Sequence, residues 1–328
     1  MVHSRVGLLV LVLALGCGFL AACGSSDDAG SESQTQAQPK EKSGFKIAYS
    51  AWSTNDPYSS GILAGLKQTA AKLGDKVVLV TNANNDAEKQ GHDVSDIVAI
   101  KPDAVVLAPI DIAQSKAWVK RLTAANIKVF TMLLAVDHYG LPLYEGVSGA
   151  VQYDEAAGAA ENAKILAQHL KPPAKVAVLM GQPGNLQADL RYKGFSEELE
   201  KHGDYTVIKS APGQYTPANG LATCQSLIAS NPGLKAIFSE SDVETTGCIR
   251  APNIGKTYVL STGGSPPDQE SIKDGKVLGT SCYLPEPFAQ AGMEDLHKVL
   301  TGERKEGLLR NFVPTGVTKE TIASCPRK

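Results

Sequence analysis

Beyond its N-terminal region, the sequence lacks any apolar run long enough to cross a membrane. A spanning helix needs about 20 consecutive apolar residues, and the apolar segments after residue 23 are all far shorter. The numbers of positive and negative side chains are also nearly equal, with 32 Lys and Arg residues and 34 Asp and Glu residues. We therefore expect a body that does not enter the membrane core and has no basic surface for nucleic acid.

Signatures of catalysis are also missing. The sequence contains no GxSxG, no GxxxxGK[ST] and no HExxH motif, which mark hydrolase nucleophiles, phosphate loops and zinc sites. The glycine pair in Thr262–Ser265 is typical of an ordinary strand-to-helix turn. The histidines of the body are scattered without ligand spacing, at His92, His138, His169, His202 and His297. We expect neither an enzyme nor a bound metal or cofactor.

The N-terminus has the pattern of an export signal. Arg5 precedes an apolar run over Val6–Leu20, and small residues lead to Cys23. Residues 1–22 are predicted to be a signal peptide, and Leu20–Cys23 resembles the lipobox of bacterial lipoproteins. On that resemblance Cys23 is the acylated first residue of the mature chain, which places the protein outside the cytoplasm with only a lipid anchor in the membrane. An ordinary cleaved signal or an uncleaved anchor are the alternatives.

Residues 23–44 are predicted to be a flexible tether. Between Gly24 and Gly44 the chain has no aliphatic side chain larger than Ala, so ordering it would bury too little surface to offset the lost entropy. The body from Phe45 onward exceeds the usual size of one domain and suggests two lobes.

Within the body, apolar bursts alternate with amphipathic stretches, a pattern typical of βαβ units with parallel strands. The expected strands are Lys46–Ala51, Lys76–Val80, Ala104–Leu107, Lys128–Leu133, Lys175–Met180, Thr206–Ile208, Lys235–Phe238, Thr257–Leu260 and Val277–Ser281. The expected helices are Tyr58–Leu73, Ala87–Ile100, Gln114–Ala125, Asp154–Leu170, Gln187–His202, Ala218–Ser230, Val243–Arg250 and Asp268–Asp274. We predict an α/β fold with two doubly wound parallel-sheet lobes and a ligand cleft at the carboxyl ends of the strands.

The order and spacing of several short segments resemble the ribose-type (type I) periplasmic binding proteins of sugar ABC transporters. The segments are Ile47–Tyr49, Asn55–Tyr58, Gly61–Gly65, Asn84–Asp86, Lys101–Leu107, Arg191–Phe195, Ala236–Asp242, Asp274–Lys276 and Thr301–Glu303. They cover nearly the whole body in order, although no single one is decisive.

The resemblance implies two lobes joined by three hinge strands, which close on a small molecule and are then recognised by permease subunits. It assigns 45–151 with 285–311 to lobe 1, and 152–284 with 312–328 to lobe 2. The last helix, about Pro287–Leu300, belongs to lobe 1, and the tail after about Asn311 returns to lobe 2. A monomer without nucleic-acid partners is expected.

Three residues fall where the family's sugar-binding residues lie. Arg191 matches the arginine of the first lobe 2 helix, and Tyr58 and Tyr215 match aromatic positions of the two lobes. In such sites aromatic faces stack on the sugar ring, while charged groups satisfy its hydroxyls in a dry cleft. A solvated helix arginine is the alternative for Arg191.

Elsewhere the sequence departs from the sugar pattern. The family's Asp-Arg pair after the fourth strand is Leu133-Leu134 here, its Asn after the third strand is Ala108, and its late lobe 2 Asp is Gly263. With fewer partners for buried hydroxyls, the ligand is expected to be a small sugar or polyol, or a less polar molecule such as an aromatic compound.

Other positions of the cleft have gained aromatic or altered polar side chains. Trp52 follows the first strand, and Tyr153 and Tyr283 stand at the first and second hinge; each is either a ligand contact or hinge packing. Asp56 is either a partner for a cation such as a quaternary amine or the N-cap of the helix that begins at Pro57. Ser241 and Gln182 complete the candidate set. Presentation of the ligand to a sensory receptor is an alternative to transport.

Four cysteines of the body, Cys224, Cys248, Cys282 and Cys325, allow three pairings if they form disulfides, with free buried thiols as the alternative. Successive right-handed crossovers place the helices that carry Cys224 and Cys248 side by side. The resemblance returns the tail with Cys325 to lobe 2, near Cys282. We therefore predict Cys224–Cys248 and Cys282–Cys325.

Overall fold

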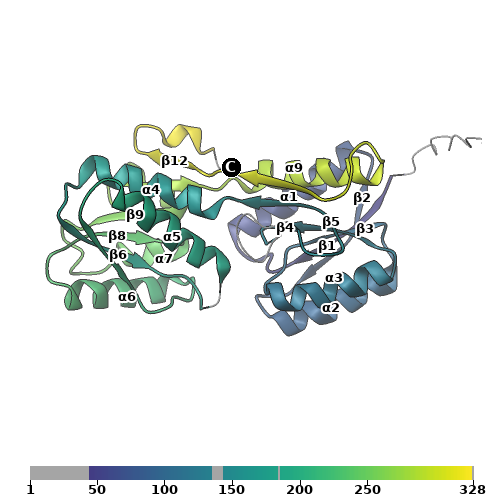
Figure 1. The fold of residues 1–328 in the computed structure, drawn as a ribbon, viewed down its shortest axis with the longest axis horizontal. Helices are drawn as coiled ribbons and strands as arrows, with labels where there is room; N and C mark the ends of the chain where they lie inside the picture. The colour runs from purple at the N-terminus through teal and green to yellow at the C-terminus, as the bar shows by residue number, and fades with distance from the viewer. Residues whose placement is uncertain (1–43, 135–142, 184, 327–328) are drawn as a thin grey trace, which may run out of the picture. The chain divides into compact units, whose positions relative to one another are not determined.

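The computed structural model describes residues 44–134, 143–183 and 185–326, which form two α/β lobes, each built on a six-stranded sheet (Figure 1). The signal peptide, Cys23, most of the tether and His138 lie outside the described residues. In the described part of the chain, no helix is long and apolar enough to span a bilayer.

Lobe 1 is formed by most of the N-terminal half of the chain and by a later segment that contains α9 and β11. Its strands are β1 (Lys46–Ala51), β2 (Lys76–Asn82), β3 (Ala104–Leu107), β4 (Lys128–Met132), β5 (Val147–Tyr153) and β11 (Leu308–Phe312). Its helices are α1 (Pro57–Lys72), α2 (Ala87–Ile100), α3 (Ile112–Ala124) and α9 (Pro285–Leu300). The strand order is β11-β5-β4-β3-β1-β2, and all neighbours are parallel.

Lobe 2 repeats this plan. Its strands are β6 (Ala174–Leu179), β7 (Tyr205–Lys209), β8 (Leu234–Ser239), β9 (Tyr258–Gly263), β10 (Gly279–Cys282) and β12 (Thr315–Thr318). Its helices are α4 (Glu155–His169), α5 (Leu186–Glu200), α6 (Pro217–Ser230), α7 (Asp242–Cys248), α8 (Pro266–Lys273) and the short 3-10 helix η1 (Ile322–Ser324). The order is β12-β10-β9-β8-β6-β7, with only β12 antiparallel to its neighbour.

Helices cover both faces of each sheet, which explains why the strands are apolar on both sides. In β1, Ile47 and Tyr49 face the core shared with α1 and α9, whereas Ala48 faces the core shared with α2 and α3. Although α9 comes late in the chain, it packs beside α1 (Figure 1).

The predicted elements are present, with ends that shift by a few residues. Helix α4 stops at His169, ahead of the two prolines that were expected to end it. Three strands were missing from the prediction: β5, β11 and β12. In β5 all seven residues are buried, yet its sequence VSGAVQY mixes small and polar residues and gives no apolar burst.

Close contact between α4 and α5 determines the geometry of lobe 2. A Cβ atom at Gly194 of α5 would lie 2.1 Å from the carbonyl oxygen of Ala156 in α4. Only glycine allows the two backbones to approach this far. The contact brings the first turn of α4, with Glu155, against the first turns of α5, with Gln187 and Arg191.

The chain passes between the two sheets three times: after β5, between β10 and α9, and between β11 and β12. Both predicted cysteine pairs are bonded in lobe 2, with Cα–Cα distances of 5.2 Å for Cys224–Cys248 and 5.8 Å for Cys282–Cys325. The second bridge fastens the C-terminal tail to the end of β10, next to one of these crossovers.

Candidate functional site

In lobe 1, the candidate residues Trp52, Asp56 and Tyr58 lie together where β1 leads into α1. The rings of Trp52 and Tyr58 are 6.2 Å apart and tilted by 45°. Asp56 caps α1: one carboxylate oxygen accepts from the Ser59 backbone N–H at 2.9 Å, and the other accepts from the Ser59 hydroxyl. The helix-cap alternative for Asp56 is thus confirmed, and a ligand contact by this residue stays a prediction.

In lobe 2, Arg191 is the centre of a buried polar network. Its Nε donates to Glu155 Oε2 at 2.8 Å and its Nη1 donates to the carbonyl oxygen of Glu240 at 2.8 Å. Burial by itself lowers the pKa of the guanidinium, but Glu155 and the hydroxyls of Tyr283 and Tyr215 outweigh it and raise the pKa well above its ordinary value. Arg191 therefore carries a fixed positive charge, and it is not the solvated helix arginine of the alternative.

Glu155, which the sequence did not single out, is the main partner of Arg191. As the first residue of α4 it sits next to the N-cap Asp154, and its side chain is only 3% exposed. Oε1 accepts from Gln187 Nε2 at 2.9 Å, and Oε2 accepts from Arg191 and from the Tyr283 hydroxyl at 2.6 Å. Three donors thus satisfy this carboxylate, which meets the usual requirement for a buried charge.

Tyr153 and Tyr283 pack where the chain crosses between the lobes. The Tyr153 ring stacks on Phe288 with centroids 4.3 Å apart, lies 4.6 Å from the Tyr283 ring, and its hydroxyl donates to the Leu284 carbonyl oxygen at 3.0 Å. The Arg191 guanidinium lies 5.2 Å from the centre of the Tyr283 ring. Both rings therefore pack at the crossover, and Tyr283 also contacts Arg191 and Glu155. A ligand contact by either tyrosine stays a prediction.

Tyr215 and Gln182 belong to neighbouring loops of lobe 2. Tyr215 adopts a left-handed backbone conformation with φ of 54°, held by a bond of 3.0 Å from its N–H to Glu244 Oε1. Its hydroxyl accepts from Asn185 Nδ2 at 3.4 Å, and burial raises its pKa to about 12. Gln182 is exposed.

Two buried carboxyl groups underlie these loops, and the sequence prediction missed both. Glu240 accepts from the Gly181 N–H at 2.7 Å through Oε2, while its Oε1 has no partner. Burial raises the pKa of Glu240 to about 8 and also raises the pKa of Glu244. No motif could have marked Glu240, since only its place under the Gly181 loop makes it unusual.

Ser241 and Gly263 lie at the ends of β8 and β9. Ser241 is the N-cap of α7, accepting from the Val243 N–H at 3.2 Å. Gly263 has φ of 137°, and a Cβ atom there would lie 2.4 Å from Asp242 Oδ2. The Asp242 carboxylate, which accepts from the Ser265 N–H at 2.9 Å, thus borders the position where the family has its aspartate.

A small cavity of about 20 Å³ joins residues of both lobes beside this network. It is lined by Leu133, Leu134, Gln152, Tyr153, Glu155, Leu186, Gln187 and Leu190. Leu133 has a left-handed backbone with φ of 72°, which is rare for a side chain of this kind. The leucine pair that replaces the family's charged pair therefore lies beside Glu155, and makes this side of the site apolar.

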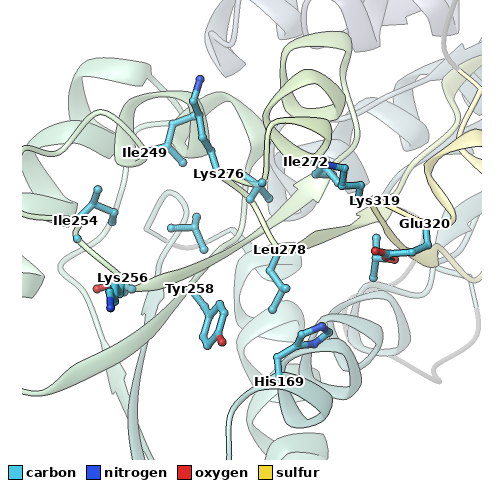
Figure 2. A pocket seen from close by; sticks show the side chains of 16 residues that line it. His169, Ile249, Ile254, Lys256, Tyr258, Ile272, Lys276, Leu278, Lys319 and Glu320 are labelled. Carbon is cyan, nitrogen blue, oxygen red and sulfur yellow. Dashed lines mark hydrogen bonds between the residues drawn. The ribbon is translucent and has the colours of Figure 1, made fainter.

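A second cavity of about 490 Å³ lies elsewhere in lobe 2, at the opposite ends of β9 and β10. Figure 2 shows Tyr258, Leu278, His169, Lys256 and Lys319 among the side chains that line it. None of the candidate residues lines it. In the described part of the chain, no group of three or more His, Cys, Asp and Glu side chains is arranged to hold a metal ion.

The arrangement contains groups that suit a small polar molecule. The guanidinium of Arg191, the carboxylate of Glu155 and the carboxyl group of Glu240 can donate to or accept from hydroxyl groups, and Trp52 and Tyr58 offer aromatic faces. Among the described residues, the network contains no nucleophile held by a general base in the manner of a catalytic triad. Arg191, Tyr215, Tyr283 and the end of β8 come together, while Trp52, Asp56 and Tyr58 form a second group in lobe 1.

Comparison with known proteins places this architecture. The family described as "Periplasmic binding protein domain" matches residues 47–304. The ribose import binding protein of Escherichia coli (strain K12) is 28% identical over 261 residues, covering 79% of this chain and 86% of the relative. The xylitol-binding protein of Mycolicibacterium smegmatis is 23% identical over 306 residues, covering 92% and 82%.

Solved structures share the fold. An ABC transporter solute-binding protein from Bacillus halodurans, with bound myo-inositol, superposes with a TM-score of 0.77 at 18% identity, covering 86% of this chain and 98% of that one. The two lobes, the Arg191 network and the family match lead to one conclusion. The chain belongs to the periplasmic binding protein family, in its ribose-type (type I) branch, and is a solute-binding protein of the ABC-transporter class and not an enzyme.

Proposed function

We propose that this chain is an extracytoplasmic solute-binding lipoprotein of an ABC importer, which captures a small sugar or polyol between its lobes by hinge closure. The observation that carries the proposal is the partly buried Arg191, fixed by Glu155 and by the Glu240 carbonyl beside the end of β8. A charged donor with its orientation already set loses little entropy when it binds a hydroxyl. Two relatives are named as a ribose import binding protein and a xylitol-binding protein, which supports the same ligand class.

Backbone conformation adds support for the position of the site. Leu133 and Tyr215 both have left-handed backbones, with φ of 72° and 54°, although neither is glycine. Such conformations cost of order 1–3 kcal/mol each and concentrate at functional sites. One residue comes from each lobe, which is the arrangement that a ligand held between the lobes requires.

The ligand should have fewer buried hydroxyls than the family's usual sugars, or one apolar face. Leu133 and Leu134 line the small cavity beside Glu155 and offer no hydrogen bond. A hydroxyl buried against them would lack a partner, at a cost of about 1–3 kcal/mol. We therefore favour small or deoxygenated sugars and short polyols such as glycerol.

A cationic ligand is the weaker candidate. Its expected partner was Asp56, but both carboxylate oxygens of Asp56 already accept from Ser59. Arg191 also adds a positive charge to the site, which opposes a cation. Presentation of the ligand to a sensory receptor would use the same closed form as transport by permease subunits.

Export and anchoring follow from the N-terminal segment. The apolar run Val6–Leu20 and the lipobox-like Leu20–Cys23 support cleavage before Cys23, acylation of that cysteine, and a tether of residues 23–44 to the body. The mature protein would then be a monomer held at the outer face of the cell membrane by its lipid alone.

A thermal-shift screen of the purified body tests the ligand class. The panel is ribose, allose, xylitol, myo-inositol and glycerol, with choline and benzoate as cationic and aromatic representatives. A ligand present at 100 times its Kd stabilises the folded state by about 2.7 kcal/mol, so a true ligand raises the Tm in a concentration-dependent way. A shift with choline or benzoate and none with any sugar or polyol would contradict the proposal.

A further inference from the structure

Glu155 forms an ion pair with Arg191 at the candidate site. Its side chain and that of Arg191 are 3% and 13% exposed, so water screens neither of them well. Their bond of 2.8 Å uses the Nε–H of the guanidinium, and Nη1 contributes a second bond to the Glu240 carbonyl. Arg191 has five N–H groups, so one on Nη1 and two on Nη2 are not used in these bonds.

The same carboxylate is tied to two of the three crossovers between the lobes. Glu155 follows the end of β5 by two residues, and its Oε2 accepts from Tyr283, the residue after β10. Gln187 donates to Oε1 at 2.9 Å, so both oxygens of the carboxylate have hydrogen-bond donors. A ligand that contacts Arg191 therefore meets a negative charge at a fixed position.

We propose that Glu155 is a specificity-determining residue: by compensating the charge of Arg191, it admits neutral polyhydroxy compounds and excludes the corresponding carboxylates. This inference rests on the proposed function and deepens it. A neutral hydroxyl can accept a charge-assisted hydrogen bond from Arg191, and the negative charge of Glu155 does not repel it. A sugar acid would form the bidentate pair that arginine favours, but its carboxylate would lie close to that of Glu155 in a poorly screened environment.

The decisive variant is Glu155→Gln, which keeps the shape and an acceptor oxygen for Arg191 while removing the charge. Calorimetry would compare two matched pairs, ribose with ribonate and xylitol with xylonate. We expect the wild type to bind no acid, and the variant to gain at least about tenfold in affinity for the acids. Glu197→Gln, on the exposed face of α5, makes the same change in net charge and should leave the acids unbound.

The outcomes separate this inference from the proposed function. Acid binding by Glu155→Gln, absent from the wild type and from Glu197→Gln, supports the inference whether or not a neutral compound binds. An unchanged preference, or equal loss of both members of a pair, would show that Glu155 only positions Arg191 and would overturn it. Failure of every neutral compound to bind the wild type would overturn the proposed ligand class alone. If circular dichroism shows that Glu155→Gln is unfolded, Glu155→Ala removes the same charge and gives the same readout.

Discussion

The hydroxyl of Tyr153 donates to the carbonyl oxygen of Leu284 at 3.0 Å. Tyr153 ends β5, at the first passage between the lobes, and Leu284 precedes α9, at the second. The bond therefore joins two of the three segments that any hinge motion must bend. Because the Tyr153 ring is also stacked on Phe288, the two segments are expected to move as one unit.

Replacing Tyr153 with Phe tests this relationship. The variant keeps the ring and its stacking but removes one hydrogen bond, so the free energy of unfolding should fall by about 0.5–1.5 kcal/mol. Ligand affinity, measured by calorimetry, should change less than tenfold. A loss of affinity well beyond tenfold with unchanged stability would instead identify the hydroxyl as a ligand contact.

Arg191→Ala should remove most ligand binding. Loss of a charged hydrogen-bond donor costs about 2–4 kcal/mol of binding free energy, or roughly 30-fold to several hundredfold in Kd. The structure adds a cost, because Glu155 would be left buried without its cationic partner, and breaking such a pair costs about 3–5 kcal/mol.

Calorimetry below the unfolding transition, with urea denaturation alongside, separates the two effects in this variant. Arg250→Ala, at an exposed arginine of the same lobe, is the matched control and should change neither quantity. Unchanged affinity in Arg191→Ala would refute the assignment of the site.

The sequence predicted the lobes well because buried parallel strands are apolar on both faces and stand out between helices. It failed at β5, where Ser148, Gly149 and Gln152 interrupt the apolar pattern although every residue of the strand is buried. Only the neighbouring strands β4 and β11, the second of which comes much later in the chain, give these residues their environment.

The residues of the candidate site were also only partly predictable from the sequence. Arg191 could be found from its place in a family pattern. Glu155 could not, because an acidic residue in the first turn of a helix is commonplace and needs no partner to explain it. Its role depends on the close approach of α4 to α5 at Gly194, a tertiary contact that no local pattern encodes.

Cys23→Ser should release the protein from the membrane. Serine cannot carry the thioether-linked lipid, and within residues 44–134, 143–183 and 185–326 no helix is long and apolar enough to span a membrane. Fractionation of cells expressing the wild type and the variant, followed by immunoblotting, would show the change. A variant that stays in the membrane fraction would mean that the apolar run is an uncleaved anchor.

Removal of the Cys282–Cys325 bridge should destabilise lobe 2. Loss of a native disulfide typically costs about 2–5 kcal/mol, and more for longer loops. The sequence separation is 43 residues here and 24 for Cys224–Cys248, so the double Ala variant at Cys282 and Cys325 should lose slightly more stability than the double Ala variant at Cys224 and Cys248. Urea denaturation of both measures the difference, and an unchanged stability in either would show that its bridge does not form in the exported protein.

Glu240 should make the stability of the protein fall as pH rises. Burial raises its pKa from the ordinary 4.5 to about 8, with Asp189 and Glu244 adding to the shift and the Gly181 N–H and Arg191 opposing it. Between these two pH values the folded state holds a proton that the unfolded chain has lost. Each pH unit in this window then costs up to about 1.4 kcal/mol of stability, and the loss levels off above pH 8 because both states are ionised there.

Glu240→Gln removes this titration while keeping an oxygen to accept from the Gly181 N–H. The free energy of unfolding, measured by urea denaturation from pH 5 to 9, should therefore show the variant gaining on the wild type as pH rises toward 8 and keeping a constant advantage beyond it. The exposed Glu200→Gln serves as the control for loss of one carboxyl group. If the difference between variant and wild type stays the same across the range, the Glu240 carboxyl titrates alike in the folded and unfolded chain, and the buried Oε1 must have found a partner that keeps it ionised.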